Sequence, residues 1–370
     1  MKIAIAVDRL VNYGGVERII SLLADRFDVD IYVGWYTPET TFQNLREKRI
    51  TQLIPPGSVL NKPYMYRLRG RVVQHRFKSL RIPEHDAYIT FGGKSLSIAR
   101  NHHPCVWHCQ APTRWLYDLY LEELKKYSFP KKQLFQLSCH FLRKADQENV
   151  KSVDKIVAIA GNVRERVRRT YGRDSVIAYP PVDISRFRYR RTGDFYLSSA
   201  RLTPDKRVDV IVSAFQEMPE ARLIVAGGGS DLEKIRKMAV GHPNIEVLGW
   251  VSEQKLMELY SDCIATIAAS LHEDFGLVAT ESMAAGKPAI APGDKGFAET
   301  VVDKKTGLLI DPSKENIIAA VKYLTPEKAK EMRSDCERRA QDFSEEKYLS
   351  GLRKAIEDAI SEYKKRKDHA

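Results

Sequence analysis

A short apolar strand, a glycine-containing loop and an amphipathic helix follow one another in both halves of this chain. In the first half the expected strand spans residues 2–7, Gly14 and Gly15 form the loop, and the helix covers 17–27. The next apolar strand, at 30–33, completes a strand–helix–strand unit. Such units fold with a right-handed crossover into a parallel sheet. The sequence therefore predicts an α/β fold built on parallel sheets.

The second half repeats this order with its own strand, loop and helix. A strand is expected at 195–200, a helix at 208–218, and a second strand at 222–226, which leads into Gly227. The chain has 370 residues, which leaves room for two domains. We therefore predict two Rossmann-like domains that face a cleft, at 1–185 and 186–345, followed by a final helix over 346–370.

The amino-acid composition indicates where the protein is located and which partners it binds. There are 60 Lys and Arg against 48 Asp and Glu, a net charge of +12, which indicates an acidic partner. No nucleic-acid motif accompanies the charge, so a diphosphate and an anionic membrane surface are the expected partners. The first residues read as a strand and not as a signal peptide. Five scattered cysteines fit a reducing compartment. We expect a cytoplasmic protein, with peripheral contact to the inner face of a membrane.

The stretch 272–288 carries most of the functional information. It begins polar, becomes helical near Asp274–Gly276 and ends at Gly286, with a proline just beyond. The unpaired N–H groups of a helix start bind phosphate, and Gly276 permits close approach of a ligand. Glu273 and Glu281 would lie roughly 12 Å apart on a continuous helix, at ~1.5 Å per residue.

Several interpretations of this stretch are open from the residues alone. The two carboxylates could line one long ligand, or the helix start could simply be solvated. A glycosidase pair needs carboxylates roughly 5–9.5 Å apart, and the separation argues against it.

A second group of polar residues follows an expected strand near residue 106. His102, His103, His108 and two nearby cysteines suggest zinc, but no second pair of ligands follows at a suitable spacing. His108 instead stands at the end of a strand, where open α/β sheets bind ligands. We expect no metal site here.

A basic segment lies between residues 64 and 81. Its cations alternate with aromatic and aliphatic residues, as in a basic helix that lies on anionic lipid. A folded helix with a solvated face is the alternative. The cations are Arg67, Arg69, Arg71, Arg76, Lys78 and Arg81.

Three of these patterns resemble a known family. The run Glu273-Asp-Phe-Gly276, with Glu281 and then Ala-Ala-Gly-Lys-Pro288, resembles the signature of retaining glycosyltransferases of family four, which have the GT-B architecture. The run from His108 to Arg114 is similar to the His-x-x-Pro-x-Arg segment of the family's mannosyltransferases. The loop from Arg201 to Asp209 resembles its diphosphate-binding loop.

The resemblance implies a role for each matching residue. It implies that His108 contacts the donor sugar and its phosphate, that Arg201 and Lys206 neutralise the diphosphate, and that Glu273 binds the sugar or stabilises charge on the reacting carbon. Glu281 would hold the ribose. The remaining donor-binding residues are Gly14, Gly15, Gly227, Val251, Asp274, Phe275, Gly276 and Leu277. Arg69, Arg71, Arg76 and Arg114 are assigned to the acceptor or the membrane.

The expected activity follows from these roles. A hexose, mannose from GDP-mannose, moves with retention to a glycan or lipid-linked acceptor. No metal or cofactor is expected, because the cations can neutralise the diphosphate and no Asp-x-Asp motif is evident. The alternatives are a UDP-sugar donor, a sugar-nucleotide epimerase and a non-catalytic sugar-nucleotide-binding protein. One departure is noted: Lys295 stands before Gly296 where the family has a first glycine.

Overall fold

The structure, a computed structural model, describes residues 1–369, and of Pro63 and Arg67 it describes the backbone alone. The chain forms two compact units, which are described separately. Unit 1 comprises residues 1–178 together with the chain from Leu349 on, and unit 2 comprises Tyr179–Tyr348. The division after Ala178 lies a few residues before the expected boundary at 185.

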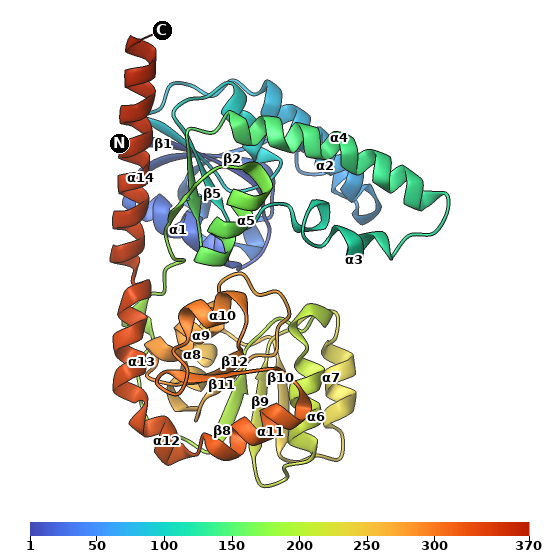
Figure 1. The fold of residues 1–370 in the computed structure, drawn as a ribbon, viewed down its shortest axis with the longest axis vertical. Helices are drawn as coiled ribbons and strands as arrows, with labels where there is room; N and C mark the ends of the chain where they lie inside the picture. The colour runs from blue at the N-terminus through green and yellow to red at the C-terminus, as the bar shows by residue number, and fades with distance from the viewer. Residues whose placement is uncertain (370) are drawn as a thin grey trace. The chain divides into compact units, whose positions relative to one another are not determined.

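Unit 1 contains a seven-stranded parallel sheet (Figure 1). Strand β1 (Lys2–Leu10) is buried from Ile3 to Val7 and pairs on one side with β2 (Asp28–Tyr36) and on the other with β4 (Ala87–Thr90). Buried on both faces, it reads as a nearly continuous apolar run. In spatial order the strands are β3 (Arg49–Gln52), β2 (Asp28–Tyr36), β1 (Lys2–Leu10), β4 (Ala87–Thr90), β5 (Cys105–Cys109), β6 (Lys155–Ala158) and β7 (Val176–Ile177).

The helices of unit 1 connect these strands. Helix α1 buries Ile19, Ile20 and Leu23, the apolar face that the sequence pattern predicted. The helices are α1 (Gly15–Arg26), α2 (Tyr66–Ser79), α3 (Tyr120–Leu124), α4 (Lys131–Lys151) and α5 (Gly161–Tyr171). The final helix, α14 (Glu345–Asp368), belongs to unit 1 from Leu349 on, where Glu362 accepts a hydrogen bond from Lys155 at 2.6 Å.

Unit 2 repeats the parallel arrangement with a six-stranded sheet. In spatial order the strands are β10 (Ile245–Gly249), β9 (Arg222–Ala226), β8 (Phe195–Ser198), β11 (Thr266–Ile267), β12 (Ala289–Pro292) and β13 (Gly307–Ile310). The helices are α6 (Val208–Gln216), α7 (Leu232–Ala239), α8 (Glu253–Asp262), α9 (Leu277–Ala284), α10 (Lys295–Thr300), α11 (Lys314–Tyr323), α12 (Pro326–Glu331) and α13 (Arg333–Ala340).

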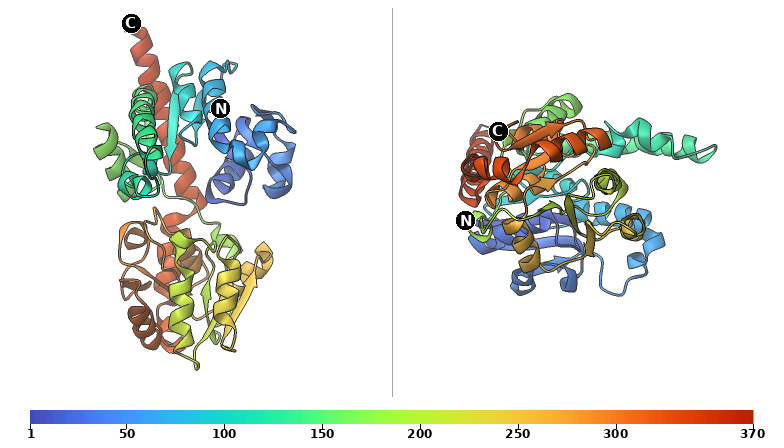
Figure 2. Two further views of the ribbon diagram at one scale, coloured as in Figure 1. Left: turned by 90° about the vertical axis from the view of Figure 1, so that its right-hand side faces the viewer. Right: turned by 90° about the horizontal axis from the view of Figure 1, so that it is seen from below.

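The strand order reverses direction once in each sheet. In unit 1 the chain runs outward from β1 to β3, then returns to β4 beside β1 and runs out on the other side. In unit 2 the same reversal lies between β8 and β11. Right-handed crossovers then place the helices of the two halves on opposite faces of each sheet, as Figure 2 shows for unit 2. Open α/β sheets bind ligands at the carboxyl ends of their strands at this reversal.

The expected elements and the observed ones differ most between residues 115 and 137. The apolar pattern of the sequence predicts a helix only from Leu137 to Val153, but α4 already begins at Lys131 and ends at Lys151. The first turn of α4 was missed because its apolar residues do not face a core: Leu134 and Leu137 are exposed. Periodicity identifies a helix by its buried face, and of the α4 residues before Leu137 only Phe135 is partly covered.

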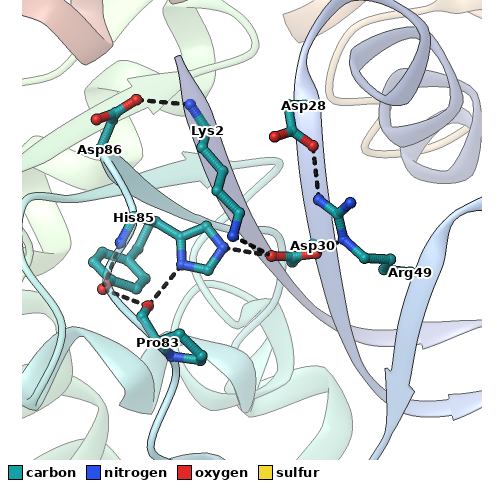
Figure 3. A network of polar contacts seen from close by, with 8 residues as sticks. Lys2, Asp28, Asp30, Arg49, Pro83, His85 and Asp86 are labelled. Atoms are coloured by element: carbon teal, nitrogen blue, oxygen red, sulfur yellow. Dashed lines mark hydrogen bonds and ion pairs between the residues drawn. The ribbon is translucent and has the colours of Figure 1, made fainter.

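A polar network lies at the edge of the unit 1 sheet where its strands begin (Figure 3). Asp30 accepts hydrogen bonds from Arg49 and, at 2.8 Å, from His85, and Lys2 pairs with it at 3.2 Å. Burial alone would raise the pKa of Asp30, but these partners lower it to about 2. The network joins the starts of β1, β2 and β3. It lies at the amino ends of the strands, so we assign it a structural role.

In the part of the chain that the structure describes, no helix has both the length and the apolar character needed to cross a bilayer.

Candidate functional site

Four loops of unit 2 meet at the point where its strand order reverses. They follow β8, β9, β10 and β11, and main-chain hydrogen bonds join them. Leu202 N donates to Gly228 O at 2.9 Å, Gly227 N to Gly249 O at 2.8 Å, and Leu271 N to Asp205 O at 3.0 Å. The residues predicted to bind the donor in the second domain lie on these loops or on the helix that follows the last of them. The structure thus brings together positions that are up to 80 residues apart in sequence.

Lys206 and Glu273 form an ion pair at this edge. Lys206 ends the short 3-10 helix η8 (Pro204–Lys206), after β8, and Glu273 lies in the loop after β11. Lys206 Nζ lies 2.6 Å from Glu273 Oε2, and the two side chains are only 17% and 21% exposed. The chain therefore holds a cation and a carboxylate in contact, both still reachable from solvent.

Arg201 lies on the same loop as Lys206, three residues after the end of β8. Its side chain is exposed, whereas Leu202 beside it is fully buried and anchors the loop. The turn that follows Lys206 is held by Arg207, which has a left-handed φ of 50°. Two cations are therefore presented from one anchored loop, which suits a diphosphate.

Gly227 begins the glycine-rich loop after β9. A Cβ at this position would lie 2.2 Å from the carbonyl oxygen of Ala200, and the φ of 154° is rare for residues with a side chain. The loop after β9 can therefore approach the loop of Arg201 only with glycine here. Val251, one of the predicted donor-binding residues, lies beside Ser252, whose side chain accepts a hydrogen bond from Lys255 N and caps α8.

Helix α9 starts where the sequence predicted a phosphate site. Its N-cap is Gly276, with a left-handed φ of 89°, and a Cβ here would strike the ring of Phe297. Phe275 is buried and stacks on Tyr179, with Phe343 edge-on to it. Its side chain anchors the loop, so any ligand contact of Phe275 is through the main chain. The first N–H groups of a helix have no partners within the helix and are suited to accept an anion.

Glu281 does not continue one helix from Glu273, so that part of the prediction is wrong. Helix α9 spans only Leu277–Ala284, and Glu273 precedes it in a loop. The glycine N-cap interrupts the helical geometry, so the expected 12 Å spacing has no basis. Glu281 is mostly buried and accepts a 2.8 Å hydrogen bond from Tyr260, whose hydroxyl also meets Ser199 at 2.7 Å. Sequence reasoning missed both partners, which give no pattern of their own.

Lys295 occupies the position where a glycine was expected, and its backbone shows why. Its φ of 49° is left-handed, a conformation that glycine adopts freely and other residues at a cost of roughly 1–2 kcal/mol. Its Nζ lies 2.6 Å from Nδ1 of His272, which also has a left-handed φ, of 59°. The contact joins the loops after β11 and β12, so the lysine keeps the glycine-like turn and adds a cation near Glu273.

In unit 1, the loop of Gly14 and Gly15 leads into α1. Gly14 is the N-cap of α1, and the carboxyl group of Glu17 folds back to it. Burial raises the pKa of Glu17, although main-chain hydrogen bonds at Val11 and Gly14 partly offset this. Glu17 therefore fixes the glycine loop. An acid three residues after an N-cap is the sequence signal for this arrangement.

Asp8 is a second residue of this edge that sequence reasoning missed. Its carboxylate accepts hydrogen bonds from Ser95 N at 2.7 Å and Lys94 N at 3.1 Å, so it ties the end of β1 to the loop after β4. A Cβ on Gly92 would lie 2.2 Å from Asp8 Oδ1. The pair Gly92–Gly93 was the available signal, because it leaves room for a neighbouring carboxylate.

His108 lies near the end of β5 and is fully buried. Its ring stacks on Phe91 with centroids 4.7 Å apart, and its Nδ1 lies 2.9 Å from the amide nitrogen of Gln110. Burial lowers the pKa of His108 to about 4, so the imidazole is neutral at pH 7. If the Gln110 amide donates to Nδ1, the ring proton is on Nε2, and His108 can donate a hydrogen bond from there.

The basic residues assigned to the acceptor or membrane have mixed surroundings. Arg69 lies over the ring of Trp35, 4.2 Å from its centroid, and Arg76 donates to the carbonyl of Leu53. Arg71 is exposed on α2, whereas Arg114 makes an ion pair with Asp118 at 2.9 Å. The side chain of Arg67 is outside the described part. Arg69 and Arg76 therefore support the fold of unit 1 itself.

The residues considered for a metal are dispersed. Cys105 and Cys109 are buried, and His103 pairs with Asp154 at 2.7 Å. Across residues 1–369, no three His, Cys, Asp or Glu side chains gather in a group suited to a metal ion.

Known proteins resemble this chain in fold and, over part of its length, in sequence. The solved structure of Anabaena HepE in complex with UDP-glucose matches with a TM-score of 0.73 at 17% identity, over 98% of this chain and 100% of that one. A lipopolysaccharide outer core galactosyltransferase, WaaB, matches with a TM-score of 0.69 at 18% identity, over 97% and 99%. Identities this low show the fold alone. The two parallel-sheet units are those of the GT-B glycosyltransferases.

Sequence similarity to a known family is found in unit 2. Residues 183–343, nearly all of unit 2, match the family described as glycosyl transferases group 1. This match covers less than half of the chain. A GDP-mannose-dependent alpha-(1-6)-phosphatidylinositol dimannoside mannosyltransferase of Mycobacterium tuberculosis is 26% identical over 217 residues, 54% of this chain and 56% of that protein. The chain thus spans little more than half the length of this relative.

Proposed function

We propose that this protein is a retaining hexosyltransferase that moves mannose from GDP-mannose to a glycan or lipid-linked acceptor, at the inner face of a membrane and without a metal or cofactor. The observation that carries the proposal is the ion pair between Lys206 and Glu273, 2.6 Å long, at the strand-order reversal of unit 2. This edge is where α/β sheets bind nucleotides, and a glycosyl transfer needs both a cation and a carboxylate.

The cations act on the leaving group. As the bond from the anomeric carbon to the phosphate oxygen breaks, negative charge grows on the diphosphate. Lys206 and Arg201 neutralise it from one loop, and the N–H groups at the start of α9 add hydrogen bonds. Charges held ready for a developing anion contribute about 2–4 kcal/mol each to the transition state. The chemistry therefore needs no divalent ion.

Glu273 acts on the other fragment. Positive charge grows on the anomeric carbon, and the carboxylate of Glu273 stabilises this charge or binds the sugar hydroxyls. In a retaining transfer the acceptor oxygen attacks the face that the diphosphate leaves. The new carbon–oxygen bond forms there, and the acceptor proton passes to the departing phosphate. His108 is proposed to contact the donor sugar, as the resemblance of the run from His108 to Arg114 implies, and burial keeps its imidazole neutral at pH 7.

Similarity to known proteins supports two candidates for the donor. The relative that uses GDP-mannose favours mannose, as do the runs from His108 and Glu273. A UDP-sugar is the second candidate, because a structural neighbour was solved with UDP-glucose.

Donor binding and turnover together test the proposal. A ligand that binds only the native state stabilises it by RT ln(1 + [L]/Kd), so the true donor raises the melting temperature. We expect GDP-mannose to do so and to lose mannose to an acceptor extract. The anomeric configuration of the product, measured by NMR, should match that of the donor. A larger shift with UDP-glucose would favour the second candidate, and binding without turnover would favour a non-catalytic binding protein.

A further inference from the structure

Helices α3 and α4 form an arm that extends away from the sheet of unit 1. We define the arm as residues 115–141, which comprise the turn after the 3-10 helix η6 (Arg114–Leu116), α3, the loop 125–130 and the first half of α4. The views in Figures 1 and 2 both show this part of unit 1 projecting beyond the sheet. The arm is where the exposed apolar residues of unit 1 are concentrated.

The arm exposes large apolar side chains to solvent. Five of them are between 57% and 79% exposed: Leu121, Phe129, Leu134, Leu137 and Phe141. On α4, Leu134, Leu137 and Phe141 fall within about 60° of one another, at roughly 100° per residue. They form one stripe along the helix. A contiguous apolar surface of this kind marks an interaction site.

The arm also has aromatic packing of its own. Phe135 stacks with Tyr127 at 4.8 Å and with Tyr120 at 6.0 Å between centroids, and Arg143 lies over the ring of Tyr120. Cys139 is buried. Aromatic stacking and the buried Cys139 hold the arm together, so its exposed apolar residues are not needed for its fold.

Cations border the apolar stripe. On α4, Lys131 lies about 60° to one side of Leu134 and Lys144 about 80° to the other, by the same helical geometry. Both are exposed, as are Lys125 and Lys132 near the tip. A helix with an apolar stripe between lysines has the chemistry of a segment that lies in the headgroup region of an anionic bilayer.

We propose that the arm inserts into the interface of a membrane that contains anionic lipid. The apolar stripe enters the boundary between headgroups and acyl chains, and the flanking lysines contact the phosphates. This deepens the proposed function, on which it rests for the purpose of reaching a lipid-linked acceptor. It also moves the membrane contact from α2, where Arg69 and Arg76 bond within the fold, to α3 and α4.

Charge favours a membrane over a second copy of the chain. In a symmetric contact between two arms, the lysines around each stripe would face the lysines of the other copy. An anionic surface instead attracts each of them.

Vesicle sedimentation tests the proposal with the full chain. Vesicles contain either phosphatidylcholine alone or phosphatidylcholine with 30% phosphatidylglycerol, an amount on the order of natural anionic content. We expect wild type to bind the anionic vesicles, and less so as salt rises. Lys131→Glu with Lys132→Glu should weaken binding by at least about 30-fold at low salt, since each change removes an attraction and adds a repulsion. Leu134, Leu137 and Phe141 changed to Gln should weaken it by at least about 100-fold.

Matched controls separate the arm from general charge and hydrophobicity. Lys364→Glu with Lys365→Glu removes two equally exposed lysines of α14, and Val240→Gln with Tyr323→Gln removes exposed apolar residues of unit 2. These should bind as wild type does. In Phe129→Trp, brominated lipids should quench the added fluorescence. Equal loss in controls and arm variants, or no quenching, overturns the proposal.

Two further outcomes are distinguishable. If wild type ignores vesicles and the apolar arm variant converts a dimer to a monomer, the arm binds a second copy and the membrane proposal fails. Binding of the nucleotide sugar, measured without vesicles, should be unchanged in every arm variant. Vesicle binding without any sugar transfer would refute the proposed function and leave the arm in place; transfer without vesicle binding would do the reverse.

Discussion

The ion pair between Lys206 and Glu273 implies that, in the free protein, Glu273 competes with a donor diphosphate for Lys206. A donor diphosphate must take Lys206 from a carboxylate that already contacts it at 2.6 Å. Glu273→Gln keeps the shape of the side chain and removes its charge, so the ammonium becomes available. We therefore expect this change to tighten the binding of a nucleoside diphosphate while it slows transfer.

The size of the effect follows from the exposure of the pair. Two unit charges 4 Å apart interact by about 4 kcal/mol near a protein surface and about 1 kcal/mol in water. Lys206 and Glu273 are about a fifth exposed, and desolvation offsets part of the attraction. A net of about 1–2 kcal/mol corresponds to a Kd about 5- to 30-fold lower. Loss of the carboxylate from the reaction should lower kcat by about 100- to 1,000-fold.

Titration calorimetry with GDP and UDP measures the binding part without any turnover. Glu217→Gln is the matched control, because its ion pair with Lys314 has the same 2.6 Å length in the same unit but is more exposed. It should leave binding unchanged. An unchanged or higher Kd in Glu273→Gln, with the fold intact by circular dichroism, would refute the reasoning.

Four further outcomes are expected. Lys206→Ala and Arg201→Ala should each lower kcat/KM by about 30- to 1,000-fold with little change in melting temperature, since both side chains are on a loop; wild-type turnover would remove their role. Glu281→Ala should lower the free energy of unfolding by about 1–3 kcal/mol, because it removes the carboxylate that accepts from the buried hydroxyl of Tyr260, whereas Glu281→Gln should remain folded and bind nucleotide more weakly; equal stability of the two would contradict this. Asp30→Asn should cost about 2 kcal/mol at pH 7, from a pKa lowered from 3.8 to about 2. This stabilisation is present above about pH 4 and is lost as the pH falls towards 2, so urea unfolding of the two proteins should converge there. Activity should survive EDTA, and a full loss that magnesium or manganese restores would contradict the proposed role of the cations.

The fold was predictable because its signals are local and repeated. Strands buried on both faces read as apolar runs, and the glycine loops and helices between them recur. The start of α9 was also predictable, because Gly276 and the residues after it carry a helix-start pattern. Lys206 and Glu273, 67 residues apart, could be assigned to one site only through the resemblance, since pairing across a sheet edge leaves no local pattern.

The partners that sequence reasoning missed share a physical reason. Tyr260, Asp8 and Glu17 act by accepting or donating hydrogen bonds to groups brought close by the fold. A buried hydroxyl or carboxylate looks like any other polar residue until its neighbour is known. The exposed turn of α4 was missed for a different reason. Its apolar residues do not pack on a core, so they form no buried face that periodicity could identify.

The composition of the two units bears on the order in which they can be completed during synthesis. Unit 2 is one continuous segment, whereas unit 1 needs the chain from Leu349 on. That late segment supplies Leu352, Ala355, Ile356 and Ala359, which are all buried, and Arg366, which bonds to the buried Asp154. Ribosomes add about 5–20 residues each second. The N-terminal half therefore waits many seconds, with apolar surface uncovered, for a helix made after unit 2, so the unit translated first is the one finished last.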